Sequence, residues 1–320
     1  MNPSKSVVAV LDDWEGRWSA SPLVDRLRPL ADLRIFPERL LAVGELADAA
    51  GDASVLVLNR ERTRVDAALL GALPHLRAIV NTGSGLNHIN KALTDARGIR
   101  VVPTGGRSHA VAEQTFALML AAVKQLPQLD RGLRLGRFPQ RPLVGDLYGK
   151  RLGIAGLGAI GAEVARIALA FRMRVTAWSP NLTDEKAAEH AVARAGSLLE
   201  LAAGSDVFSL HLRLAPETRG VVSADVVAAL PPGALFVNTA RAELVDTPAL
   251  LERAERGDLT VALDVFEDEP DIDPRYRALH GALSPHVGWK SEGTWDEFVR
   301  LGVACILETL ASLDLASGVA

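Results

Sequence analysis

The sequence feature that most constrains the fold is a series of short, almost wholly apolar runs separated by longer segments with helical patterns. The runs cover residues 7–11, 55–58, 78–80, 101–102, 152–155, 175–178, 207–210, 234–237 and 261–265. Strands that are apolar throughout are typical of parallel sheets with both faces covered. Most spacers are long enough for a crossover helix. The sequence therefore predicts an α/β fold built from right-handed βαβ units.

Two strand–helix series follow each other along the 320 residues, one beginning at Val7 and the other at Leu152. A chain of this length favours two domains. Between the two series, residues 125–150 are rich in Gly and Pro, which predicts a connecting region without regular structure. An apolar, Ala-rich pattern predicts a long helix over residues 108–126, and residues 297–313 are typical of a final amphipathic helix.

The composition of the chain argues against several classes of function. Lys and Arg total 35 and Asp and Glu total 39, and this near balance does not favour a nucleic-acid or anionic-membrane surface. The single cysteine, Cys305, excludes an intrachain disulfide and a multi-cysteine metal site. The longest apolar segment, residues 116–123, is too short for a membrane span. We expect a cytoplasmic protein with no metal and with no nucleic acid or membrane as partner.

A glycine-rich loop is the strongest local motif. The segment from Leu152 reads LGIAGLGAIG, in which a predicted strand runs into G-x-G-x-x-G and then a helix over residues 162–169. In such a loop the first glycine makes the turn, the second lets a pyrophosphate approach, and the third allows close helix–strand packing. The helix N-terminus adds free amides and a partial positive charge. The predicted dinucleotide site comprises Gly156, Leu157, Gly158, Ala159, Ile160 and Gly161.

The choice of dinucleotide is left open by the second strand of this series. An acidic residue that binds the ribose of NAD is expected about 20 residues after the loop. Ser179 stands there instead, directly after the run 174–178, and no Arg follows it to bind a 2′-phosphate. We expect NAD as cofactor, with NADP not excluded.

Three polar segments, residues 237–241, 263–270 and 284–288, each follow a predicted strand, where ligands bind in open α/β sheets. Taken singly, Arg241, Glu269 and His286 are equally compatible with ordinary surface positions. Together they suit hydride transfer at a carbon that bears a hydroxyl group. His286 would act as the base, Glu269 would stabilise its imidazolium, and Arg241 would bind a carboxylate or carbonyl.

With these segments in place, the chain resembles the D-isomer-specific 2-hydroxyacid dehydrogenase family. The resemblance covers nearly the whole chain and includes VNTGSGLNHI at 80–89, VAEQT at 111–115, PETRG at 216–220, the glycine loop and the three polar segments. It implies that Arg241 holds the substrate carboxylate and keto group, that Glu269 pairs with the base, and that His286 is the proton donor or acceptor. Asp264 would contact the nicotinamide carboxamide.

The resemblance also implies further binding residues. Backbone amides of a glycine-rich turn would bind the substrate carboxylate, an arrangement that forms an anion-binding nest. The residues of this turn are Gly83, Ser84 and Gly85. Besides the glycine loop and Asp264, the residues expected to bind the cofactor are Ser179, Thr239 and Ala240.

The family architecture implies two Rossmann-like domains, one flavodoxin-like and one dinucleotide-binding, with a cleft between them. Residues 1–104 with 290–320 would form a discontinuous substrate-binding domain, and residues 105–289 the NAD(P)-binding domain. The resemblance also implies a homodimer formed through residues 108–150.

We therefore expect an NAD(P)-dependent oxidoreductase that interconverts a small-molecule 2-oxo acid and a D-2-hydroxy acid. The alternative is a non-catalytic, NAD(H)-sensing interaction protein, as in the corepressors that share this fold. We expect the enzyme rather than this alternative, because the chain ends at Ala320 without a long disordered tail. Oxidation of formate or phosphite on the same scaffold is a third possibility.

Overall fold

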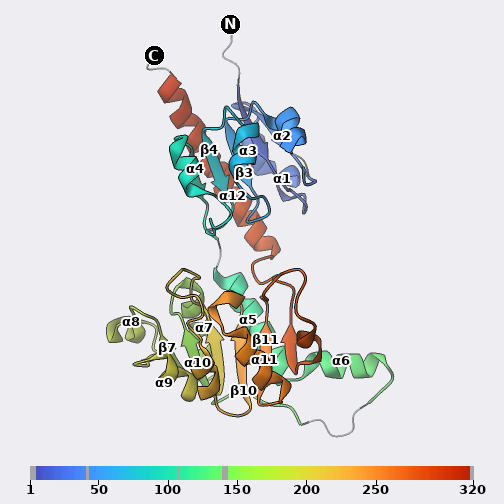
Figure 1. The fold of residues 1–320 in the computed structure, drawn as a ribbon, viewed down its shortest axis with the longest axis vertical. Helices are drawn as coiled ribbons and strands as arrows, with labels where there is room; N and C mark the ends of the chain where they lie inside the picture. Colours follow the sequence, from blue (N-terminus) through green and yellow to red (C-terminus); the bar gives the residue numbers. More distant parts are fainter. Residues whose placement is uncertain (1–4, 41–42, 107, 139–142, 318–320) are drawn as a thin grey trace. The chain divides into compact units, whose positions relative to one another are not determined.

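The computed structural model describes residues 5–40, 43–106, 108–138 and 143–317, and the chain divides into two compact units. Unit 1 consists of Met1–Arg107 with Glu292–Ala320, and unit 2 of Ser108–Ser291. Both units are built from parallel strands and helices (Figure 1). The predicted α/β fold with two parallel sheets is thereby confirmed.

Unit 1 contains a five-stranded parallel sheet in the order β2-β1-β3-β4-β5. The strands are β1 (Ser6–Val10), β2 (Ala31–Ile35), β3 (Val55–Leu58), β4 (Ala78–Asn81) and β5 (Arg100–Pro103). The helices are α1 (Arg17–Ala20), η1 (Pro22–Arg26), α2 (Val43–Ala50), α3 (Ala67–Ala72), α4 (Lys91–Ala96) and α12 (Glu292–Ser317).

The last helix completes the core of unit 1. Every residue of β3 and β4 is buried, as expected for central strands of a parallel sheet. One apolar side of α12 presents Val299, Val303, Ile306 and Leu310, which join the buried valines of β1 and β3 in one cluster. The predicted final helix is thus confirmed, and it is longer than expected.

Unit 2 contains a seven-stranded parallel sheet in the order β12-β11-β10-β9-β6-β7-β8. The strands are β6 (Arg151–Ala155), β7 (Arg174–Trp178), β8 (Ala193–Arg194), β9 (Val207–Leu210), β10 (Ala234–Asn238), β11 (Leu259–Leu263) and β12 (Gly281–Leu283). The helices are α5 (Ser108–Val123), α6 (Leu126–Arg134), α7 (Ala159–Ala170), α8 (Asp184–Glu189), α9 (Leu198–Ala203), α10 (Ala224–Ala229), η2 (Ala242–Leu244), α11 (Thr247–Glu255) and η3 (Pro274–Ala278).

The register of unit 2 brings the ends of five strands to one edge. Ala155 of β6 pairs with Leu210 of β9, and Leu210 pairs in turn with Asn238 of β10. Asn238 pairs with Leu263 of β11, which pairs with Leu283 of β12. Because the strands are parallel, the residues that follow each of them gather along this carboxyl edge.

Two sequence-based expectations need correction. Each of the nine apolar runs is a strand, but β2, β8 and β12 lie outside these runs. Regular structure also occurs within residues 125–150, because α6 occupies Leu126–Arg134. Pro127 lies in its first turn, where a missing N–H costs no helical hydrogen bond, and Gln125 before it is left-handed with φ 53°. Pro139 and Pro142 lie outside the described residues.

Among the residues that the structure describes, no helix has both the length and the apolar character that crossing a lipid bilayer requires.

Candidate functional site

The glycine loop joins β6 to α7, and each of its three glycines has a different environment. Gly156 has φ 107°, and a Cβ there would lie 2.6 Å from the carbonyl carbon of His211. A Cβ on Gly161 would overlap the carbonyl oxygen of Gly156. Around Gly158 a Cβ would meet no protein atom within 4 Å. The loop therefore packs tightly against the sheet at its two ends and leaves open space at Gly158.

The end of β7 fixes the loop through two hydrogen bonds. The amide of Gly156 donates to the carbonyl of Trp178 at 2.7 Å, and that of Leu157 donates to Ser179 Oγ at 2.8 Å. The Ser179 hydroxyl keeps its own hydrogen for another acceptor. The first amides of α7 begin directly after Gly158 and have no acceptor inside the helix. These donors and the open space fit the pyrophosphate of a dinucleotide.

His286 and Glu269 form a hydrogen-bonded pair at the carboxyl edge of the sheet. His286 Nδ1 lies 2.8 Å from Glu269 Oε2, and Glu269 Oε1 accepts the amide of Phe266 at 2.8 Å. The carboxylate is held by the backbone and can only accept, so we assign the proton of the neutral ring to Nδ1. This leaves His286 Nε2 for another partner.

Arg241 follows β10, and the side-chain amide of Asn238 holds the turn that contains it. Asn238 Nδ2 donates to the carbonyl of Arg241 at 2.9 Å, and Asn238 Oδ1 accepts the amide of Ala240 at 2.9 Å. Asn238 itself is buried, with 2% of its surface exposed. It was not singled out from the sequence, although it directly follows the predicted strand over residues 234–237.

One cavity of unit 2 brings the three catalytic candidates together. Its volume is about 580 Å³, and its lining residues are Arg241, Ala242, Glu243, Val265, Phe266, Glu267, Asp268, Glu269 and His286. A cation that can bind a carboxylate and a histidine that can exchange a proton thus share one space.

The remaining predicted cofactor residues of this edge are largely engaged within the protein. Asp264 is 2% exposed and accepts hydrogen bonds from the segment that carries His286. The hydroxyls of Thr239 and Thr115 lie 2.9 Å apart. The carbonyl of Ala240 accepts Arg241 Nη1 at 2.7 Å.

In unit 1, the turn expected to bind a carboxylate follows β4. Gly83 is left-handed with φ 87°, and its amide donates to Thr104 Oγ1 at 3.0 Å. Asn81 Nδ2 donates to the carbonyl of Gly85 at 2.9 Å and so shapes the turn. Of the three predicted donors, the amide of Gly83 therefore already has an acceptor within the protein. Ser84 is exposed.

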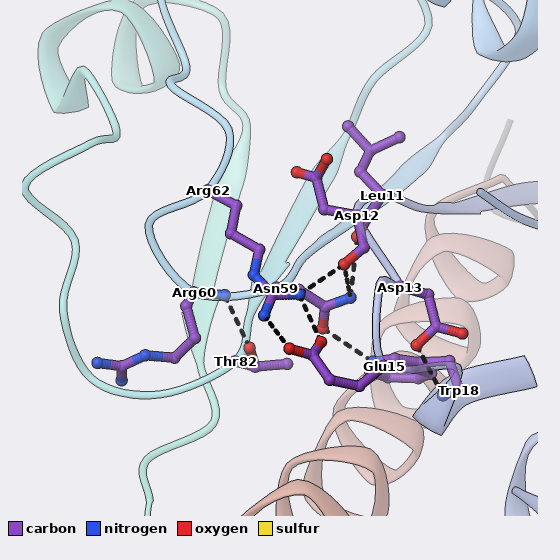
Figure 2. A network of polar contacts seen from close by, with 9 residues as sticks. All are labelled: Leu11, Asp12, Asp13, Glu15, Trp18, Asn59, Arg60, Arg62 and Thr82. Carbon is purple, nitrogen blue, oxygen red and sulfur yellow. Dashed lines mark hydrogen bonds and ion pairs between the residues drawn. The ribbon is translucent and has the colours of Figure 1, made fainter. Parts of the chain in front are cut away.

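Two arginines of the segment after β3 were missed from the sequence: Arg60, which lies beside this turn, and Arg62. Arg62 forms two hydrogen bonds with Glu15, at 2.6 and 2.8 Å (Figure 2). Its guanidinium lies 4.2 Å from the centre of the Trp14 ring. The side chain of Arg60 points away from this network in Figure 2, and Nη1 lies where a Cβ of Gly83 would be. Both arginines follow the predicted strand β3. Like Arg241, they are polar residues that follow a predicted strand, so the same criterion could have identified them.

This chain is similar to many known proteins, and three of them show how much of each chain the similarity covers. D-3-phosphoglycerate dehydrogenase of Mycobacterium bovis is 35% identical over 311 residues, which is 93% of this chain and 55% of that protein. Hydroxypyruvate reductase of Thermotoga maritima is 36% identical over 251 residues, 76% of this chain and 80% of that protein. The crystal structure of phosphoglycerate oxidoreductase from Vibrio cholerae O395 has 32% identity and a TM-score of 0.83, covering 96% of this chain and 99% of the other.

A family model defines the class of protein. Residues 116–288 match the model described as D-isomer specific 2-hydroxyacid dehydrogenase, NAD binding domain. The chain belongs to the D-isomer specific 2-hydroxyacid dehydrogenase family, as its sequence had indicated. The chain spans about half the length of the mycobacterial relative, 55%.

Proposed function

We propose that this protein is an NAD(P)-dependent oxidoreductase that interconverts a 2-oxo acid and a D-2-hydroxy acid. The observation that carries the proposal is the hydrogen bond of 2.8 Å between His286 Nδ1 and Glu269 Oε2, in a cavity that Arg241 also lines. The glycine loop at the carboxyl edge of the same sheet supports the dinucleotide. Family membership supports the same activity.

The three side chains have separate roles in this proposal. Arg241 binds the substrate carboxylate and steadies the charge that develops on the keto oxygen, because its guanidinium offers several fixed donors. In the reductive direction, His286 gives a proton from Nε2 to that oxygen, and in the oxidative direction it takes the proton back. Glu269 accepts the Nδ1 proton throughout and stabilises the imidazolium. The dinucleotide, when bound, supplies or accepts the hydride.

The residues around the loop would hold the cofactor. The amides at the start of α7 and the space at Gly158 would receive the pyrophosphate, and the Ser179 hydroxyl would face the ribose. NAD is the proposed cofactor because the matched family model describes NAD binding. Ser179 also leaves NADP open, since it carries no charge to repel a 2′-phosphate.

We further propose which residues bind the cofactor and the substrate, and how two chains assemble. Residues 105–289 would bind NAD(P), and residues 1–104 with 290–320 would bind the substrate. A homodimer through residues 108–150 is supported by the exposed apolar side chains of this stretch. They are Leu126, Leu133, Leu135, Phe138, Leu143, Val144 and Tyr148. The proposed site of action is the cytoplasm.

The test is a spectrophotometric assay with NADH and NADPH, each against 2-oxo acids from glyoxylate to bulky aromatic acids. We expect turnover by the native chain and a loss of about 10²–10⁴-fold in His286→Ala, because the proton donor is removed. Binding of NADH, followed by fluorescence, should stay close to that of the native chain.

The matched control is His280→Ala, which removes an exposed histidine of the same unit that does not line the cavity. It should retain full activity. Equal activity of His286→Ala and the native chain would refute the assignment of the base. Tight NADH binding without turnover on any acid would favour the NAD(H)-sensing alternative.

A further inference from the structure

A buried carboxylate holds the segment that carries His286 from both sides. Asp264 Oδ1 accepts the hydroxyl of Ser284 and, at 3.0 Å, the amide of Val287, while Oδ2 accepts the amide of Gly288 at 2.8 Å. These donors flank His286 in the sequence. Three of the four acceptor positions of the carboxylate are therefore used by one turn. The carboxylate is thus arranged mainly to support that turn. One acceptor position remains for the cofactor contact that the resemblance implies.

The backbone of His286 needs such support. Its φ is 52°, in the left-handed region that residues with a Cβ adopt only when their surroundings dictate it. Its amide also donates to the carbonyl of Ser284 at 3.0 Å, which tightens the turn. The conformation that directs the ring towards Glu269 thus depends on the contacts of its neighbours.

Helix α5 adds a third member to this network. Gln114 Nε2 donates to Ser284 Oγ at 2.9 Å. The Ser284 hydroxyl has one hydrogen, which it donates to Asp264, so it must accept from Gln114. A Cβ on Gly288 would lie 2.8 Å from Asp264 Oδ2 and 3.3 Å from Gln114 Cγ, so the network also requires glycine there. The hydrogen bonds run in one direction, from Gln114 through Ser284 to Asp264.

We propose that Gln114, Ser284 and Asp264 form a positioning relay that fixes the His286 turn and keeps the imidazole against Glu269. The proposal rests on the role of His286 in the proposed function. Arg241 is held by a different residue, Asn238, so loss of the relay should impair proton transfer more than substrate binding.

The decisive variant is Ser284→Ala, which removes a donor and an acceptor at once, with Ser284→Thr as the variant that keeps the hydroxyl. We expect Ser284→Ala to lower kcat by about 10- to 100-fold through misplacement of the base, with KM little changed. Ser284→Thr should restore most of the activity. Gln114→Leu should have the same kind of effect as Ser284→Ala, and it serves as the second test if Ser284→Ala fails to fold.

A spectroscopic signal of the hydrogen bond between His286 and Glu269 separates positioning from a general loss of stability. The charged groups that share the cavity with His286 are Arg241, Glu243, Glu267, Asp268 and Glu269. Of these, Glu269 is hydrogen-bonded to the ring, so a loosened turn weakens one specific attraction to the imidazolium. NMR of the nitrogen-labelled histidines, with the His286 signal identified by its absence in His286→Ala, should show the Nδ1 proton of His286 exchanging faster with water and resonating further upfield in Ser284→Ala.

The kinetic and NMR readouts distinguish a failure of the proposed function from a failure of the relay. If the native chain turns over no 2-oxo acid, the proposed function fails, but the signal of the His286 Nδ1 proton still tests the relay. If Ser284→Ala matches the native chain in both kcat and this proton signal, the relay is refuted. A lower melting temperature without a change in kcat or in the His286 signal would also refute the relay, because it would show that Ser284 only stabilises the fold.

Discussion

His211 is a histidine that the fold keeps neutral beside the glycine loop. It follows β9, its amide donates to the carbonyl of Ala155 at 2.7 Å, and its Nε2 lies 2.8 Å from Ser209 Oγ. Burial lowers the pKa of His211 from 6.5 to about 3. The ring therefore remains uncharged at the edge of the sheet throughout the physiological pH range.

This neutral histidine predicts that acid destabilises the fold. Below about pH 6.5 the unfolded chain takes up a proton at His211 and the folded chain does not, so the stability falls as the pH falls towards the folded pKa of about 3. From about pH 7 to about pH 5 this one group should remove about 1–2 kcal/mol from the free energy of unfolding. Urea unfolding at the two pH values measures the loss.

The control for this prediction is an exposed histidine of the same unit. His211→Gln should flatten the pH dependence, whereas His190→Gln on the surface should leave it as in the native chain. A native-like slope in His211→Gln would show that the acid sensitivity comes from other groups.

At the residue scale, the sequence located the catalytic candidates because polar residues that follow buried strands form recognisable segments. Arg241, Glu269 and His286 were found in this way. Asn238 and Ser284 were not, because an amide or hydroxyl that supports a turn looks like any other loop residue until its partners are known. The roles of all of these residues remain predictions until the variants are measured.

At the scale of elements, the contact between β6 and α7 depends on two glycines for different reasons. Gly161→Ala would place a methyl group against the carbonyl of Gly156 and Ile154 Cγ2, so α7 would have to move away from the strand. We expect a loss of about 1–3 kcal/mol in the free energy of unfolding, as for other overpacked sites. NADH affinity should fall with it, because the loop amides move.

Gly158→Ala is the matched variant. Its methyl group would meet no protein atom within 4 Å, so the stability should stay near that of the native chain. The affinity for NADH, measured by calorimetry, should nevertheless fall if the dinucleotide fills this space. Unchanged affinity in Gly158→Ala would contradict the proposed position of the pyrophosphate.

The strands that lie outside the nine predicted apolar runs share one property. β2, β8 and β12 are all outermost strands, and each has a single neighbour in its sheet. Such strands need fewer apolar residues, and β2 includes Asp32 and Arg34 within its five positions. The inner strands were recognisable because both of their faces are covered. Burial therefore explains most of what the sequence could reveal, although the outermost strand β5 was predicted as well.

At the scale of the whole molecule, exposed apolar surface is concentrated in one stretch of unit 2. None of the side chains of α6 is buried, and Phe138 beyond it is 80% exposed. Figure 1 shows α6 projecting beside β12 at the edge of the sheet. Exposed apolar patches of this kind commonly mark protein–protein contacts.

If this exposed apolar stretch forms a dimer interface, two added negative charges should disrupt the dimer. Replacing Leu135 and Phe138 by Glu should convert a dimer into a monomer of 34.1 kDa, because burying the new carboxylates in an interface is unfavourable. Sedimentation velocity measures the change. Leu30→Glu, at an exposed leucine of unit 1, should leave the dimer intact. A native chain that already sediments as a monomer would refute the proposed dimer.

The return of the chain to unit 1 for its last helix has a consequence for synthesis on the ribosome. Unit 2 is continuous, so its residues emerge together and can fold as soon as they are free of the exit tunnel. The valines of β1 and β3 emerge first but lack their cover until Val299, Val303 and Ile306 of α12 have been made. The N-terminal third should therefore be the last part to fold, and the part of the nascent chain that chaperones bind longest.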